Sequence, residues 1–142
     1  MKGRYEIPTD IYEKVHETML SIVNANQADD TILSSALYEE LHRFCNDQTN
    51  AGYGSGFLWE ALADVTGDEG ARVEFYERAL AFARHNSEPA HSILLALGQI
   101  HAQAGHWSRA KPLLVAARSE AIENDDVETE GEAASLLLTR DG

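Results

Sequence analysis

Apolar residues recur every three or four positions along most of this chain, and turn-forming residues interrupt them at intervals. This is the period of an α-helix with one buried face. It predicts seven helices, near residues 10–26, 30–47, 57–65, 70–85, 89–104, 108–123 and 126–140, with one long loop at 48–56. No segment shows the strict alternation that is typical of a β-strand.

Short polar side chains mark where these helices are expected to begin. Asp10 and Glu13 have the spacing of a capping box at the start of the first helix. The other expected caps are Asp29 or Asp30 for the second helix, Ser55 for the third, Ser108 for the sixth, and Asp125 or Asp126 for the seventh.

Proline and glycine add further boundaries. Pro89 is expected in the first turn of the fifth helix, and Gly105 is expected to end that helix. Around a Ser108 cap, Trp107 and Pro112 would form a hydrophobic staple. Pro112 would then lie early enough in its helix that its missing N–H costs little.

The same period predicts which residues are buried. The expected core positions are Ile11, Val15, Met19, Ile22 and Val23 in the first helix, and Leu33, Leu37, Leu41 and Phe44 in the second. In the last helix, Ala133, Leu136 and Leu137 are expected to cover the exposed end of the preceding helices.

Residues 94–117 combine small and large side chains in a distinctive order. The pattern is Leu94-x2-Leu97-Gly98-x2-His101, then Gly105, then Ala110-x3-Leu114-x2-Ala117. Gly98 and Ala110 have almost no side chain, so two antiparallel helices can approach closely where they lie. The surrounding leucines would fill the space beside that contact.

Related patterns occur upstream. Trp59-x2-Leu62-Ala63 begins 35 residues before Leu94-x2-Leu97-Gly98 and is followed by Tyr76-x2-Ala79-Leu80. At an offset of 38, Leu37-Tyr38-Glu39 and Phe44 recur as Phe75-Tyr76-Glu77 and Phe82. Together these residues resemble the tetratricopeptide (TPR) repeat, a helix–turn–helix unit of about 34 residues.

The resemblance is clearest over residues 55–124, with a degenerate helix pair at 10–48 and a capping helix at 126–140. It implies an all-α fold in one domain, 1–142: a right-handed stack of about three antiparallel helix pairs plus the C-terminal capping helix. It also implies protein binding through the inner face of each first helix. The positions that would form this groove are Phe57, Glu60, Asp64, Ser92, Leu95, Gln99, Ala102 and Gln103.

The chain is strongly acidic, with 24 acidic against 11 basic residues and a net charge of −13. This charge disfavours nucleic acid and anionic membranes as partners and favours a basic protein. Residues 120–132 hold seven carboxylates and no base: Glu120, Glu123, Asp125, Asp126, Glu128, Glu130 and Glu132. They form either an acidic surface for a cationic protein or merely solvated helix ends. Family members that bind acidic tails need cations in the groove, whereas Glu60 and Asp64 have the opposite sign.

Residues with reactive or metal-binding side chains are present but poorly arranged for chemistry. His42 and Cys45 lie three apart, and His101 and His106 five apart, without the further ligands or orienting group that a metal site or nucleophile requires. Cys45 corresponds to Ala83 in the repeat and is expected to be buried. Gly52, Gly54 and Gly56 are spaced like part of a phosphate-binding glycine loop, but no strand precedes them, so the evidence for such a loop is weak. No cofactor or metal is expected.

Several features favour a cytoplasmic protein. The single cysteine suits a reducing compartment, no run of 18 apolar residues is present, and the first residues do not have the pattern of a secretory signal. We expect a non-enzymatic immunity-type protein that neutralises a basic partner such as a toxin. The alternatives are an adaptor or secretion-type chaperone that holds an extended client segment and, more distantly, a small enzyme that uses His42 and Cys45.

Overall fold

The computed structural model describes residues 7–141. Over this range the chain is helical without a strand, which confirms the predicted all-α class. The helices are α1 (Thr9–Gln27), α2 (Thr31–Gln48), the short π-helical segment η1 (Thr49–Tyr53), α3 (Gly56–Asp64), α4 (Glu69–Asn86), α5 (His91–Gln103), α6 (Trp107–Glu123) and α7 (Val127–Asp141). None of these helices is long and apolar enough to cross a membrane.

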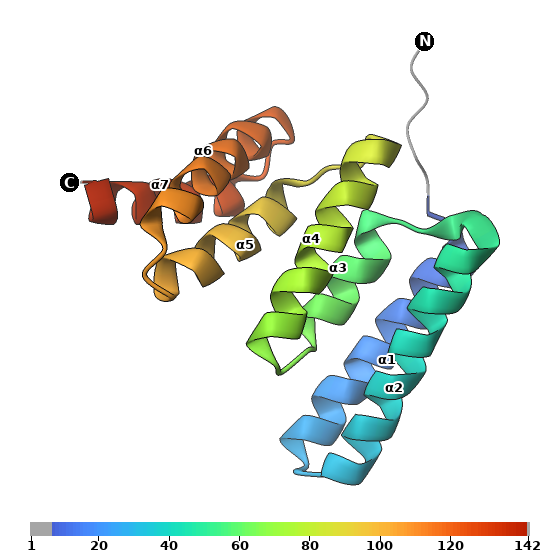
Figure 1. Ribbon diagram of the computed structural model, residues 1–142. Helices are drawn as coiled ribbons and strands as arrows, with labels where there is room; N and C mark the ends of the chain where they lie inside the picture. Colours follow the sequence, from blue (N-terminus) through green and yellow to red (C-terminus); the bar gives the residue numbers. More distant parts are fainter. Residues whose placement is uncertain (1–6, 142) are drawn as a thin grey trace. The chain divides into compact units, whose positions relative to one another are not determined.

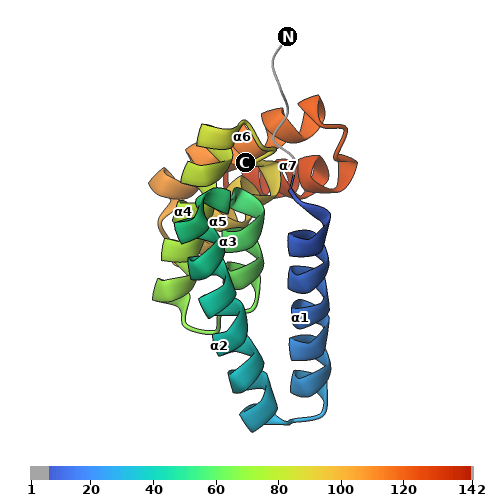
Figure 2. The same cartoon turned by 90° about the vertical axis from the view of Figure 1, so that its right-hand side faces the viewer.

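The chain divides into two compact units, residues 1–82 and 83–142, with the boundary inside α4. In the first unit, α1 and α2 run antiparallel and side by side (Figures 1 and 2). The Asp30 side chain caps α2 as predicted, because its Oδ1 accepts a hydrogen bond of 3.0 Å from the Leu33 N–H.

The start and the inner face of α1 differ from the prediction. Pro8 occupies the N-cap position and no side chain of the described residues caps the helix, so the Asp10–Glu13 capping box is wrong. Val23 is 44% exposed rather than buried. The residues that α1 does bury are Ile11, Val15, Thr18, Ile22 and Ala25.

The long loop predicted at residues 48–56 is mostly helical, because α2 continues directly into η1. Gly52 adopts φ +95°, which other residues rarely adopt. Gly54 permits a close approach, since a Cβ there would lie 2.6 Å from the Phe82 ring. These two glycines therefore have structural roles in the turn before α3.

The turn before α3 ends in the predicted Ser55 cap, whose Oγ accepts a 3.2 Å hydrogen bond from the Leu58 N–H. Trp59 of α3 is buried, and its Nε1–H donates to Thr49 Oγ1 at 3.0 Å. The Arg78 guanidinium from α4 lies 4.4 Å from the centre of the Trp59 ring. Side-chain contacts with both neighbours thus hold α3 between η1 and α4.

In the second unit α6 packs against both α5 and α7 (Figure 1). Gly98 and Ala110 are buried, and a Cβ at Gly98 would lie 2.6 Å from Leu114 Cδ2. The predicted close contact between these helices therefore exists. Asp126 caps α7, since its Oδ1 accepts a 3.1 Å hydrogen bond from the Thr129 N–H, and Ala133 is fully buried.

Three predicted boundaries in this unit are wrong. The α5 helix begins at His91 with Ala90 at its N-cap, so Pro89 precedes the helix. The α6 helix begins at Trp107 after His106, which excludes both the Ser108 cap and the staple around it. Pro112 consequently lies inside α6 and has no N–H to donate to the carbonyl of Ser108, which is an exposed residue of the first turn.

Four helices end in the same backbone turn. A residue just after the end of each helix has a positive φ. The N–H of the residue that follows it donates to the carbonyl five residues earlier in the chain, as in a Schellman motif. The positive-φ residues are Asp29 (φ 56°), Ser87 (φ 59°), Gly105 (φ 82°) and Asp125 (φ 56°). The closing bonds are Asp30 to Ala25 (2.9 Å), Glu88 to Ala83 (2.9 Å), His106 to His101 (2.8 Å) and Asp126 to Ala121 (2.9 Å).

Candidate functional site

The short helix α3 presents a single narrow face to its surroundings. Of its nine residues, only Phe57, Glu60 and Asp64 are not buried. These are the three positions predicted from the sequence for this helix, and their spacing places them one above another on one side. The structure therefore brings this predicted set together on one face within the first unit.

Asp64 is tied to the neighbouring helix α4. Its Oδ1 accepts a 2.5 Å hydrogen bond from the Tyr76 hydroxyl, and Arg72 lies close to the same pair. Partial desolvation raises the pKa of Asp64, against the opposing effects of the Tyr76 hydroxyl and the Arg72 charge. Burial and the Asp64 carboxylate raise the pKa of Tyr76 well above its ordinary value. Asp64 thus has a structural role as well as an exposed position.

An exposed apolar stripe on α1 adjoins the α3 face. Tyr12 is 50% exposed, Leu20 55% and Val23 44%, and with His16 they are spaced to share one side of the helix. The Tyr12 ring stacks on the Phe57 ring at 5.2 Å and on the His16 ring at 6.1 Å. We call the stripe Tyr12, His16, Leu20 and Val23 together with Phe57, Glu60 and Asp64 the α1–α3 face.

The sequence prediction missed the α1 part of this face. It assigned Val23 to the core, because Ile22 and Val23 are adjacent and both apolar. The available signal was the second apolar spacing, Tyr12–His16–Leu20–Val23, which lies next to the buried one. The exposed carboxylates Glu13 and Glu17 border this stripe on α1, one residue after Tyr12 and His16.

The predicted groove residues of α5 lie in the second unit and have different environments. Leu95 is only 8% exposed and packs inside, and Ala102, at 2%, leaves little of its surface exposed. Ser92 and Gln103 are exposed. The Gln99 side chain donates a 3.1 Å hydrogen bond to the Glu132 carboxylate on α7.

A hollow of about 280 Å³ separates α5 from α7 at this point. Arg140 of α7 lies at its edge, and its guanidinium donates a 3.2 Å hydrogen bond to the Ala102 carbonyl. The residues that line it are Gln99, Ala102, Gln103, Glu132, Ser135, Leu136 and Arg140. Three of the predicted residues, Gln99, Ala102 and Gln103, therefore line one concave surface.

The acidic run at residues 120–132 is partly structural. Glu120 forms a two-pronged ion pair with Arg84, with N–O distances of 2.8 and 2.7 Å. Asp126 caps α7 and lies 3.1 Å from His91 Nε2, and the hydrogen bonds from Thr129 lower the pKa of its carboxyl group. Glu132 is bound to Gln99, and Glu123, Asp125, Glu128 and Glu130 are the acids of the run with no such bond to another residue of 7–141.

Cys45 lies in the core of the first unit, as predicted. The thiol is fully buried and donates a 3.4 Å hydrogen bond to the Leu58 carbonyl. Burial raises the pKa of this thiol to about 12, whereas a nucleophilic cysteine needs its pKa lowered. His42 packs among aromatic rings, 5.3 Å from Phe75 and 6.2 Å from Trp59.

The other histidine pair shares a helix end. The rings of His101 and His106 are 6.2 Å apart, and the His106 N–H bonds to the His101 carbonyl as part of the turn. Within residues 7–141, no three His, Cys, Asp or Glu side chains are grouped so that they could hold a metal ion.

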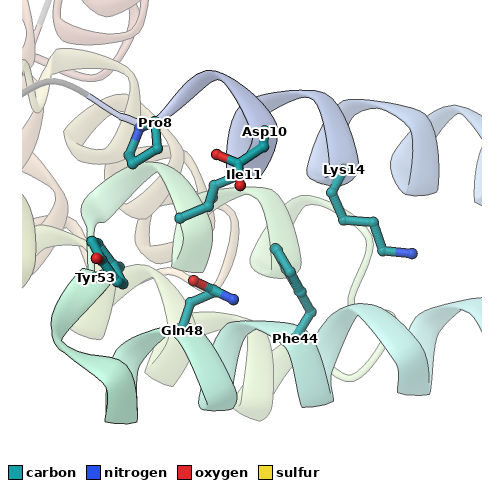
Figure 3. Close-up of a pocket in the computed structure, with 7 residues that line it drawn as sticks. All are labelled: Pro8, Asp10, Ile11, Lys14, Phe44, Gln48 and Tyr53. Carbon is teal, nitrogen blue, oxygen red and sulfur yellow. The ribbon is translucent and has the colours of Figure 1, made fainter.

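Two further cavities lie in the first unit. One of about 370 Å³ separates α1 from α2 near η1 and contains Asp10, Lys14 and Gln48 over an apolar floor of Ile11 and Phe44 (Figure 3). Lys14 is also 3.6 Å from Glu40, so its charge is partly compensated. The other cavity, of about 620 Å³, lies between α1, α2 and the turn that joins α3 to α4.

Comparisons with protein-family models, with curated proteins and with solved structures found no match for this chain.

Proposed function

We propose that this chain is a non-enzymatic, cytoplasmic interaction protein that binds a basic protein partner through the α1–α3 face. In this proposal it acts as an immunity-type inhibitor, which covers and neutralises a partner such as a toxin. The helix pairs would form a tetratricopeptide-like stack, and the close approach of α5 and α6 at Gly98 and Leu114 supports that architecture.

One observation carries the proposal: an exposed apolar and aromatic stripe lies beside carboxylates in a chain of net charge −13. Exposed apolar side chains that are contiguous on one helix side, as Tyr12, Leu20 and Val23 are, mark interaction surfaces. Aromatic residues are enriched at interface centres, with polar residues at the rim. Glu13, Glu17 and Glu60 would form such a rim and would attract a cationic partner.

The charge should act mainly on the rate of encounter. Opposite net charges accelerate association, and salt screens this attraction beyond a Debye length of about 8 Å at physiological ionic strength. The dissociation rate should change less with salt, because contacts at the desolvated centre hold the complex once it has formed.

The test is a comparison of two charge-reversed proteins. Tyr12→Ala with Glu60→Lys alters the α1–α3 face, whereas Glu123→Lys with Glu128→Lys alters exposed acids of the second unit. Proteins captured from native cells are compared for wild type and both variants, after circular dichroism has shown that all are folded. The partner should be basic, should bind wild type and the Glu123/Glu128 variant, and should be lost by the Tyr12/Glu60 variant.

With the purified partner, the association rate should fall steeply with salt, and the partner's own activity should be inhibited on titration. An acidic partner, or an association rate that does not respond to salt, would overturn the electrostatic part of the proposal. If the Glu123/Glu128 variant loses the partner instead, the binding surface is the acidic α6–α7 end.

A second candidate function is an adaptor or chaperone that holds an extended client segment. The hollow between α5 and α7 favours it, because the Gln99 and Gln103 amides can bond a peptide backbone. Gln103→Ala with Ser135→Ala would then weaken client binding, while Tyr12→Ala with Glu60→Lys would leave it unchanged.

A further inference from the structure

The 620 Å³ cavity of the first unit has a volume typical of small-molecule sites. Its walls come from α1, α2 and the α3–α4 turn, which are distant in the sequence. Two carboxylates line it, Glu39 on α2 and Asp68 in the turn before α4. Among the lining residues that the structure describes, none is lysine or arginine, and His42 is the one basic side chain beside these carboxylates.

The remaining polar lining consists mostly of neutral hydrogen-bonding groups. Asn26, Ser34 and Ser35 supply an amide oxygen and two hydroxyls. The Tyr38 ring is held in place by a 2.8 Å hydrogen bond between its hydroxyl and Thr66 Oγ1, so its orientation is defined. An aromatic face beside carboxylates attracts organic cations through both the ring quadrupole and the charges.

From this arrangement we infer that the cavity between α1, α2 and the α3–α4 turn is a binding site for a guanidinium-bearing organic cation. Guanidinium is planar and donates up to five hydrogen bonds, which matches the two carboxylates and several neutral acceptors that line the cavity together with Tyr38. A phosphate or carboxylate ligand would be repelled by Glu39 and Asp68. This site is separate from the α1–α3 face and does not depend on the proposed protein partner.

The probe is arginine amide, compared with citrulline amide, which has the same shape but a neutral group in place of guanidinium. Binding is followed by amide chemical-shift changes in the ¹⁵N-labelled full chain. The expected changes for arginine amide centre on Ser34, Ser35, Tyr38 and Gly67. Citrulline amide should bind about tenfold more weakly or not at all, because it lacks the charge-assisted hydrogen bonds.

Matched variants test the two carboxylates. Glu39→Gln and Asp68→Asn each remove a charge, and asparagine can still cap α4 where Asp68 accepts the Ala71 N–H at 2.9 Å. Each should weaken binding of arginine amide about tenfold. Glu40→Gln is the control, since Glu40 pairs with Lys14 and does not line the cavity. It should change the affinity by less than about twofold.

A blocked tripeptide with a central arginine distinguishes the source of the cation. If it binds like arginine amide, the site takes an arginine side chain of a protein; if only arginine amide binds, it takes a small molecule. Both results support the site. Equal binding of the arginine and citrulline probes, or an equal loss for Glu40→Gln and Glu39→Gln, would overturn it. Neither result bears on the proposed protein partner, which is tested separately by its loss from the Tyr12/Glu60 variant.

Discussion

Gly98 of α5 faces Leu114 of α6 at a distance that leaves no room for a side chain. A Cβ at Gly98 would lie 2.6 Å from Leu114 Cδ2 and 2.7 Å from Leu114 Cγ. Carbon atoms in contact normally lie about 3.5–4.0 Å apart, so the two helices or the Leu114 side chain would have to move by about 1 Å. Leu114 is fully buried, which leaves it little space to move into.

Gly98→Ala therefore combines two opposing effects. Overpacking of a core costs about 1–3 kcal/mol. Replacing glycine by alanine inside a helix stabilises it by about 1 kcal/mol. We expect a net loss of about 1 kcal/mol in the free energy of unfolding, and a larger loss for Gly98→Leu.

Leu114→Ala reveals the cause, because it removes the atoms that meet the new Cβ. By itself it should cost about 2–5 kcal/mol through the cavity it leaves. On that background Gly98→Ala should become stabilising, by up to about 1 kcal/mol, since only the helix preference remains. The coupling energy of the double-mutant cycle is then about 1–3 kcal/mol.

Gly131→Ala is the control, because Gly131 lies inside α7 of the same unit with nothing within 4 Å of its missing Cβ. It should stabilise the protein by about 0.5–1 kcal/mol. Urea unfolding followed by circular dichroism at 222 nm measures wild type and these five variants, with the slope m checked for constancy. If Gly98→Ala stabilises wild type as Gly131→Ala does, or keeps its sign on the Leu114→Ala background, the close contact is not the cause.

Three further outcomes are expected from urea unfolding. The free energy of unfolding should fall between pH 9 and 12, because burial raises the pKa of the Cys45 thiol from 9.0 to about 12, so this thiol ionises in the unfolded chain before it does so in the folded chain. Cys45→Ala should remove this part of the pH dependence. A pH profile of Cys45→Ala identical to that of wild type would refute the explanation. His106→Asp should stabilise α6 by about 1 kcal/mol, since His106 occupies an N-cap with no side-chain bond, and Asp30 and Asp126 make that bond in two similar turns. Gly105 has φ +82°, so Gly105→Ala should destabilise the protein by about 1 kcal/mol. Asp125 has φ +56°, so Asp125→Gly should stabilise it. Changes of the same sign in the free energy of unfolding for the two variants would contradict the turn assignment.

Local chemistry was readable from the sequence. The Asp30, Ser55 and Asp126 caps each join residues three apart, so none of the three depends on where other helices lie. The exposed face of α3 was predicted from the resemblance to the repeat, which assigns Phe57, Glu60 and Asp64 to the inner face of a first helix, and their spacing alone places them on one side. The Gly98 contact followed from the small residues opposite Leu114.

What the sequence left undecided depends on how helices are placed beside one another. The Arg84–Glu120 pair joins residues 36 apart, and the Tyr12–Phe57 stack joins α1 to α3. No local pattern states which of two apolar stripes on α1 turns inward, so Val23 was assigned to the wrong one. The 620 Å³ cavity forms only where three separate segments of the chain meet. The proximity of its two carboxylates, Glu39 and Asp68, therefore cannot be predicted from the sequence pattern alone. Hydrogen bonds within one helical turn are set by residue spacing, whereas these contacts require the packed backbone.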